Sequence, residues 1–225
     1  METMRGDIID GRLSPGQKLT EAKLSAALGI SRTPLREALF QLEQEGLLTR
    51  NRGGYSVASF SLPEVIDAIE LRGFLEGAAV RCAAERGVAP AKLKSVEAIL
   101  GKLDRAVAAV DHKSYGKLNT KFHEELAGLA GSKMLQAEVL RSYRFPFAHP
   151  SGFPTNLAGK QHLKMKISEG QAQHRAIVEL IKSGDGKAAA EAMLMHARHA
   201  IANVEAAYLE KVKTNRVIAP LSLVT

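Results

Sequence analysis

The sequence predicts a mainly α-helical protein of two domains, and three observations indicate it. Alanine and leucine are abundant in a chain of 225 residues that is 45% hydrophobic and only 5% aromatic, a composition that favours helices. Three short helical patterns and an alternating stretch around Gly53-Gly54 occupy residues 1–60, and long helical patterns follow from Ser61. We therefore expect an N-terminal winged helix-turn-helix over residues 1–60 and an all-α antiparallel helical bundle over residues 61–225.

The first sixty residues divide into three helices and a hairpin. The segment "DIIDGRL" has the spacing of a first helix, and a Pro-Gly turn follows it. Thr20 can cap a second helix that ends at Gly29, and Ser31 can cap a third that ends at Glu45. The stretch "LLTRNRGGYSVASF" alternates between apolar and polar residues and predicts a two-stranded hairpin, the wing.

Six longer helices are expected after the first domain, because apolar residues recur there at helical spacing. Their expected ranges are 61–87, 90–110, 113–130, 133–148, 160–183 and 185–213. A loop rich in proline and glycine separates the fourth from the fifth. The tail from about residue 214 has no expected element.

Composition restricts the class of protein. The single cysteine, Cys82, excludes an intramolecular disulfide framework and suits a reducing cytoplasm. No signal segment or apolar run of membrane-spanning length is present, so we expect a cytoplasmic protein without membrane contact. The net charge of +7 permits a nucleic-acid partner. Residues 1–60 hold eight Lys/Arg and seven Asp/Glu, however, so a DNA-binding interpretation depends on where the arginines lie.

The start of the third helix has a pattern that suits DNA. In "GISRTPLREAL" the arginines lie four residues apart, beside a buried leucine stripe, and the third helix of this fold enters the major groove N-terminal end first. Arginine binds guanine edges or phosphates through paired hydrogen bonds. The expected DNA-binding residues are Ser31, Arg32, Thr33, Arg36, Arg50, Arg52 and Gly53. The alternative is that the two helix arginines pair with Glu37, Glu43 or a neighbouring helix.

Three histidines of the bundle lie on helix faces that should point inward. They are His123, His174 and His196, and facing helices of a bundle can build a metal site from such side chains. Imidazole suits zinc, nickel, copper or iron, and three ligands leave positions open for water or substrate. The alternative is that each is a core histidine bonded to a backbone carbonyl. His199 lies off the face of His196 and ranks behind it.

Two sets of motifs resemble a known family. The segment from "IIDGRLSPG" through "SRTPLREAL" to "GGYSV" resembles the GntR family of bacterial transcription regulators. The segments "ELRGFLEGAAV", "NTKFHEELAG", "QHRAIVELIKSGD" and "AMLMHARHA" resemble the FCD effector domain of its FadR-type branch, with a VanR-like six-helix variant as the alternative.

The resemblance implies functional residues. Arg32, Thr33 and Arg36 would contact DNA, with Gly53 at the wing. A divalent transition metal, zinc or nickel, would be held by Asn119, His123, His174 and His196. Members of the family usually have Asp at the first of these positions, and Asn119 brings no negative charge, which should lower the affinity for metal. Family members of this type sense small organic acids or sugar acids.

An anionic effector also agrees with a basic run between residues 141 and 175. The candidate effector-binding residues are Arg72, Arg141 and Arg144. Glu76, one helical turn from Arg72, is an alternative partner for it. A solvated basic face is the alternative explanation of the basic run.

The sequence thus predicts a homodimeric regulator that is not an enzyme. It would bind a double-stranded DNA operator and act as a repressor released by a small anionic metabolite. The alternative from another class is a His-cluster, metal-dependent hydrolase fused to a DNA-binding module, with Glu124 or Glu125 near the histidines. A third possibility is a metal-free bundle that binds its ligand through arginines alone.

Overall fold

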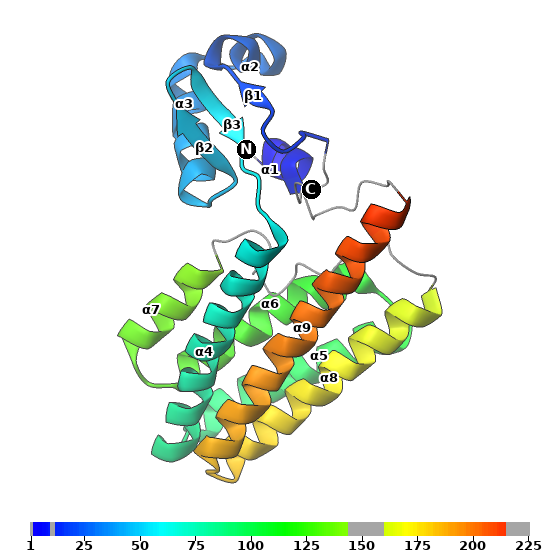
Figure 1. Cartoon of the computed structure of the whole chain (residues 1–225). Helices are drawn as coiled ribbons and strands as arrows, with labels where there is room; N and C mark the ends of the chain where they lie inside the picture. The colour runs from blue at the N-terminus through cyan, green and yellow to red at the C-terminus, as the bar shows by residue number, and fades with distance from the viewer. Residues whose placement is uncertain (1, 10–11, 144–159, 215–225) are drawn as a thin grey trace.

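The computed structural model describes residues 2–9, 12–143 and 160–214. A small N-terminal domain sits at one end of a larger helical bundle (Figure 1). The N-terminal domain holds α1 (Glu2–Ile9), β1 (Lys18–Leu19), α2 (Glu21–Leu28), α3 (Arg32–Gln44), β2 (Leu48–Asn51) and β3 (Gly54–Val57). The bundle holds α4 (Leu62–Arg86), α5 (Pro90–Ala109), α6 (His112–Leu129), α7 (Lys133–Ser142), α8 (Lys160–Lys182) and α9 (Gly186–Thr214). The predicted fold class is confirmed.

The N-terminal domain is organised around α3. Its Leu35, Leu39 and Leu42 recur at helical spacing and are fully buried, against apolar residues of α1 and the sheet. β2 and β3 form the predicted antiparallel hairpin, with Leu48 opposite Val57. The sheet has a third strand that the sequence did not predict, because β1 is only two residues long and shows no alternation. The strand order is β1-β3-β2.

One glycine of the wing is required by close packing. Gly54 has a φ of 129°, and a Cβ placed there would lie 2.8 Å from the carbonyl oxygen of Leu19. Any other residue at this position would clash with β1 and strain the backbone. Gly53 was the wing glycine singled out from the sequence, but the conformational requirement falls on Gly54.

The bundle begins at a well-defined cap. Ser61 accepts a hydrogen bond from the backbone N–H of Glu64, and the Glu64 carboxylate accepts one from the backbone N–H of Ser61, a capping box that starts α4. α4 packs along α9, with Gly73 so close that a Cβ would lie 2.6 Å from that of Ala197. The predicted helices agree with the structure to within about one to two residues at most ends. The fourth helix ends at Ser142, earlier than the expected 148, and residues 144–148, the following loop and the tail fall outside the described residues.

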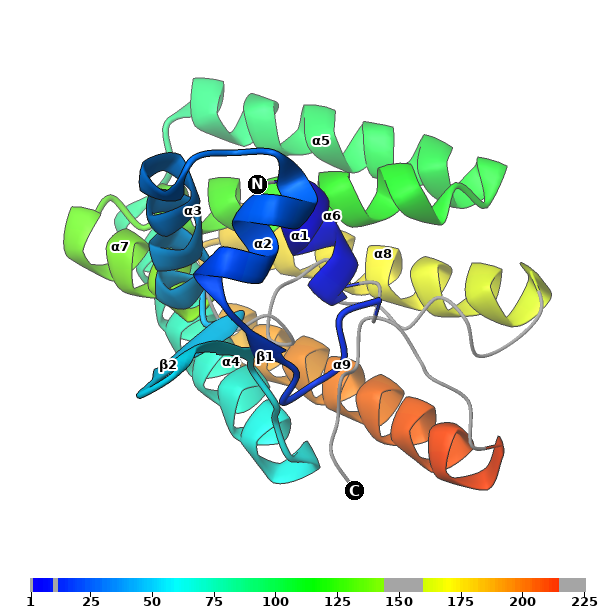
Figure 2. The same ribbon diagram turned by 90° about the horizontal axis from the view of Figure 1, so that it is seen from above.

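The bundle surrounds an apolar core. Figure 1 shows α4 and α9 on one side and α5, α6 and α8 behind them, and Figure 2 shows the N-terminal domain over one end of these helices. α6 contributes Phe122 and Leu126 to the core, and α8 and α9 contribute Ile177 and Met193. All four side chains are buried. This packing fixes the positions of the few polar side chains that also point inward.

Candidate metal centre and DNA-binding surface

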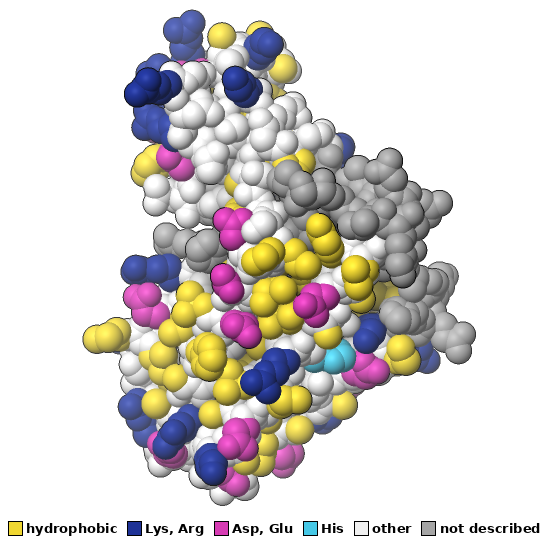
Figure 3. All heavy atoms as spheres, viewed as in Figure 1, with side chains coloured by type: hydrophobic (Ala, Val, Ile, Leu, Met, Phe, Trp, Pro, Cys, Tyr) yellow, Lys and Arg dark blue, Asp and Glu magenta, His cyan; other side chains and the backbone are white. Residues whose placement is uncertain are grey.

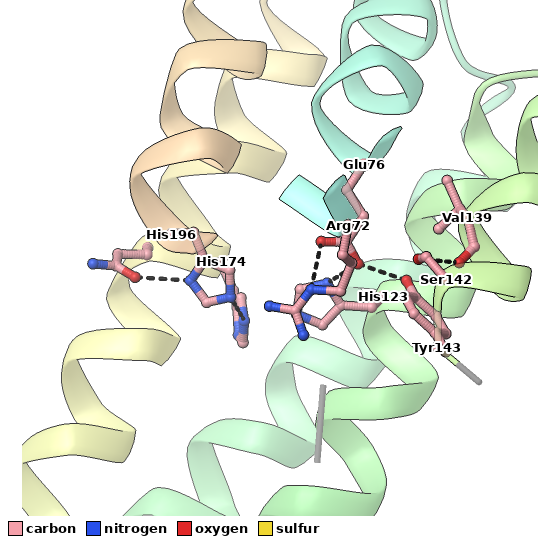
Figure 4. Close-up of polar contacts among 9 residues, drawn as sticks. Arg72, Glu76, His123, Val139, Ser142, Tyr143, His174 and His196 are labelled. Atoms are coloured by element: carbon pink, nitrogen blue, oxygen red, sulfur yellow. Dashed lines mark hydrogen bonds and ion pairs between the residues drawn. The ribbon is translucent and has the colours of Figure 1, made fainter. Parts of the chain in front are cut away.

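Three helices bring three histidines together inside the bundle. His123 comes from α6, His174 from α8 and His196 from α9, with exposed fractions of 1%, 0% and 6%. Each offers a ring nitrogen, and these nitrogens lie within 4.8 Å of one another (Figure 4). The ring of Phe122 lies against His174, with the ring centroids 4.4 Å apart. The cluster predicted from the sequence is therefore assembled inside the bundle, shielded from solvent.

A hydrogen bond at each Nδ1 fixes which nitrogen of each ring carries the proton. His123 Nδ1–H donates to the Glu76 carboxylate at 2.9 Å, and His174 Nδ1–H donates to Gln171 Oε1 at 3.2 Å. His196 Nδ1–H donates to Gln173 Oε1 at 2.8 Å. Because all three acceptors are oxygens, each neutral ring keeps its proton on Nδ1 and presents a lone pair at Nε2.

The three Nε2 lone pairs are left for a cation. Nε2 of His123 is buried and has no hydrogen-bond partner among the residues that the structure describes. Nε2 of His174 lies 3.3 Å from Nε2 of His196, and two lone pairs cannot satisfy each other. Two nitrogens bound at 2.0–2.1 Å to a tetrahedral zinc would be separated by ~3.3–3.4 Å. The donor set and its spacing thus fit a divalent transition metal.

Glu76 anchors the metal-facing ring of His123 to two other helices. Its carboxylate also accepts a hydrogen bond from the Tyr143 hydroxyl at 2.6 Å and lies 3.6 Å from the guanidinium of Arg72 (Figure 4). Burial raises the pKa of Glu76, but the adjacent His123 and Arg72 and the hydrogen bonds from His123 and Tyr143 outweigh it and lower the pKa to about 2. Glu76 is therefore ionised at neutral pH and orients the imidazole as second-layer carboxylates do in zinc sites.

Burial inside the bundle also keeps the imidazoles of His174 and His196 neutral. Burial lowers the pKa of His174 and of His196 well below the ordinary value of 6.5, and the neighbouring His123 and Arg72 lower both further. A neutral imidazole is the form that binds a metal ion. His174 and His196 are therefore in the metal-binding protonation state at neutral pH without any metal present.

This protonation predicts acid sensitivity of the metal-free protein. Both histidines take up protons more readily when unfolded, so their contribution to stability is present above pH 6.5 and is lost as the pH falls below it. Between pH 7.5 and 5.5 we expect the free energy of unfolding to fall by about 2–3 kcal/mol for the two rings together. Urea unfolding of chelator-treated protein measures it. An equal fall in a His174→Gln/His196→Gln variant would contradict this origin.

The other residues predicted for the metal and effector site do not all lie beside the histidines. Asn119 is buried one helical turn before His123 on α6, the same face of that helix. Arg72 is buried beside the cluster and forms the ion pair with Glu76 that the sequence offered as its alternative. Arg141 is exposed on α7 and lies 3.5 Å from Glu138, so the structure does not bring it to the histidines. Arg144 lies outside the described residues.

The residues that orient the imidazole rings were not predicted from the sequence. Gln171 is held in place because its amide donates to Leu100 O at 3.1 Å and to Asp104 Oδ1 at 2.8 Å. Gln173, Tyr143 and Glu76 had likewise not been assigned to the site. A carboxylate between apolar residues and glycine in "FLEGAAV" was the one available signal, because a charge there must find a buried partner.

The start of α3 points away from the core and towards solvent. Arg32 and Thr33 are exposed, and the side chain of Arg36 is 65% exposed while its Nε lies 2.8 Å from Glu21 Oε2 of α2. An exposed ion pair of this kind is weak, so the guanidinium remains available to a phosphate or a base. Ser31 occupies the N-cap position, but its side chain makes no capping hydrogen bond, contrary to expectation.

The wing presents the other predicted DNA contacts. Arg50 on β2 and Arg52 and Gly53 in the turn are all exposed. Lys and Arg side chains gather at the end of the N-terminal domain farthest from the bundle (Figure 3). The exposed α3 start and the exposed wing thus belong to one small domain with a basic end, the arrangement that a winged helix-turn-helix uses to bind DNA.

Within the described part of the chain, none of the helices combines the length and apolar character needed to cross a membrane.

Comparisons with known proteins agree with these features. Residues 1–56 match the family described as "Bacterial regulatory proteins, gntR family", and residues 67–199 match the FCD domain. The Nta operon transcriptional regulator of Aminobacter aminovorans is 34% identical over 152 residues, which are 66% of this chain and 71% of that protein. The probable D-xylose utilization operon transcriptional repressor of Paenarthrobacter nicotinovorans is 28% identical over 194 residues, covering 84% of this chain and 80% of that protein.

A solved structure shows the same architecture. McbR/YncC of E. coli has a TM-score of 0.70 at 20% sequence identity and covers 92% of this chain and 95% of its own, which shows a shared fold. Both family matches coincide with the two parts of the structure, the winged helix-turn-helix and the helical bundle. The chain belongs to the GntR family of bacterial transcription regulators and joins its DNA-binding domain to an FCD effector domain.

Proposed function

We propose that this regulator is a metal-dependent repressor that releases its operator when a small organic acid or sugar acid binds in the bundle. Residues 1–60 would read the operator, and residues 61–225 would hold a divalent metal, zinc or nickel, through His123, His174 and His196. The observation that carries the proposal is the convergence of three Nε2 lone pairs, each fixed by a hydrogen bond at Nδ1. When bound, the metal would supply open coordination positions for an acid group.

Arg72 supports an anionic effector. Its side chain is buried, and it lies close enough to His174 and His196 to lower the pKa of both. Figure 4 shows its guanidinium between Glu76 and the other imidazoles. A guanidinium next to a metal ion favours a carboxylate over a neutral ligand. The similarity to the probable D-xylose utilization operon repressor of Paenarthrobacter nicotinovorans also supports repression linked to small carbohydrate-derived molecules.

A homodimer in the cytoplasm completes the proposal. Two copies of α3 would read two half-sites related by two-fold symmetry. Large apolar side chains are exposed on α4 and α9, namely Leu71, Phe74 and Met195, and Figure 3 shows apolar side chains gathered over these helices. An apolar surface of this kind favours association between protein chains. We assign it to the second copy of this chain.

The hydrolase alternative has little support. Glu124 is exposed on α6, pointing away from the buried His123, and Glu76 already accepts hydrogen bonds from His123 and Tyr143. Neither Glu124 nor Glu76 is therefore placed to act as a general base beside the histidines. The family matches and the curated relatives are regulators rather than hydrolases.

The proposal predicts that metal and acid act together on DNA binding. A duplex selected by the protein from a random-sequence pool serves as probe, with hydroxy acids from glycolate to D-gluconate as trial effectors. We expect at least one acid to weaken DNA binding of the zinc-loaded protein by about tenfold or more, within the usual range of allosteric coupling. Fluorescence anisotropy measures the affinity.

The matched controls are chelator-treated protein and a His174→Ala variant, which should bind the duplex but not respond to the acid. An equal response in chelator-treated protein, or none with any acid, would contradict the proposal.

A further inference from the structure

Helix α9 carries a further inward-facing polar residue, Asn203, beyond the candidate metal ligand His196. Asn203 follows His196 by seven residues, which is within about 20° of two full helical turns, so both side chains face the bundle interior. Asn203 is 8% exposed. Its position is about 10 Å along the helix from His196, towards the end of α9 that lies on the same side of the bundle as the N-terminal domain (Figure 1).

The amide of Asn203 has an unmet hydrogen-bonding requirement. Its Nδ2 is buried and finds no hydrogen-bond partner among the residues that the structure describes. Ala200, one helical turn before Asn203, packs against an apolar cluster that includes Val65 and Ile69 of α4. An apolar side chain would suit this environment better, since a buried donor without a partner destabilises the fold. Natural proteins contain few buried donors without a hydrogen-bond partner, so the presence of one requires an explanation.

His199 links Asn203 to the metal centre. It lies three residues after His196 and four residues before Asn203, which are the spacings of neighbours on a helix surface. Its buried Nε2 has no hydrogen-bond partner among the described residues and lies 3.4 Å from Glu169 Oε2 of α8. Polar side chains therefore follow one another along α9 at His196, His199 and Asn203.

We infer that Asn203 is the second recognition point of the effector, and this inference rests on the proposed function. The acid group of the effector binds at the metal centre, and a hydroxyl or carboxylate oxygen at its other end accepts a hydrogen bond from Asn203 Nδ2. The separation along α9 selects acids with a backbone of five or six carbons that carry a distal polar group. A two-carbon acid occupies the metal centre without reaching Asn203.

The inference is tested by calorimetric titration of zinc-loaded protein with glycolate and with D-gluconate. We expect the wild type to bind D-gluconate at least tenfold more tightly than glycolate. In Asn203→Leu the affinity for glycolate should stay within about twofold, and the preference for D-gluconate should disappear. Asn203→Gln, which keeps the amide, should retain part of the preference.

A second measurement is independent of metal, acid and DNA. In chelator-treated protein we expect Asn203→Leu to raise the melting temperature, because it removes an unpaired buried donor. The matched control is Gln171→Leu, which removes a buried amide that has its partners and should lower the melting temperature.

The outcomes separate the two hypotheses. Glycolate binding without any preference for D-gluconate, or a preference that survives in Asn203→Leu, overturns the inference and leaves the metal proposal standing. Failure of both acids to bind overturns the proposal that an acid effector binds at the metal, and the inference with it. A lower melting temperature of Asn203→Leu also overturns the inference, because it would show that the amide stabilises the empty protein.

Discussion

Replacing Arg32 and Arg36 by alanine is expected to weaken operator binding by at least about a hundredfold. Both side chains are exposed at the start of α3, which is the end of a recognition helix that enters the major groove. A base contact by arginine is worth about 1–3 kcal/mol, and a phosphate contact adds to the dependence on salt. Anisotropy titrations of a selected duplex at several salt concentrations should therefore show a lower affinity and a shallower salt dependence.

The matched control removes two positive charges elsewhere. Lys102 and Arg105 are exposed on α5, so Lys102→Ala/Arg105→Ala changes the net charge equally. We expect its DNA affinity to stay within a few-fold of wild type. Because the Arg36–Glu21 ion pair is exposed, the α3 variant should also keep its thermal stability. Unchanged salt-dependent binding in the α3 variant would show that another surface reads the operator.

Replacing Glu76 by glutamine is expected to destabilise the bundle by about 3–5 kcal/mol. The change removes the carboxylate from a buried ion pair with Arg72 and leaves a buried positive charge without this counter-ion. It also removes the acceptor that orients His123, which should weaken metal binding by about 10–100-fold. Urea unfolding of chelator-treated protein gives the first quantity, and competition with a zinc indicator gives the second.

The chain supplies its own control on the same helix. Arg81 and Glu85 form an ion pair with the same i, i+4 spacing, but it is exposed. Glu85→Gln should change neither the free energy of unfolding nor the metal affinity measurably. If Glu76→Gln behaved like Glu85→Gln, then Glu76 would not be the buried counter-ion and orienting group that the geometry indicates.

Most of the fold could be predicted from local patterns. Leu35, Leu39 and Leu42 repeat at the helical period, and Ser61 with Glu64 carries the signature of a capped helix start. The strand β1 could not be predicted, because two residues show no period and pairing depends on a strand that lies 36 residues further along the chain. The alternative that Arg36 pairs with a neighbouring helix is realised by Glu21 of α2, but the residue itself could not be named for the same reason.

Of the candidate metal site, only the three histidines could be predicted from the sequence, and their hydrogen-bond partners could not. His123, His174 and His196 each lie on the inward face of their helix, and helical spacing alone indicates this. Their hydrogen-bond partners depend on the packing of helices far apart in sequence, such as Glu76 with His123 and Tyr143. Arg141 was predicted to bind the effector but is exposed beside Glu138. A run of basic residues in the sequence does not tell which of them face solvent.

The central claim is that three imidazole Nε2 atoms converge on one divalent metal ion. X-ray absorption spectroscopy of the protein loaded with one zinc per chain tests it most directly. The account predicts three imidazole nitrogens at about 2.0–2.1 Å, completed by oxygen ligands. Zinc that fails to bind in a one-to-one ratio, or that binds with fewer than three imidazoles, would contradict it.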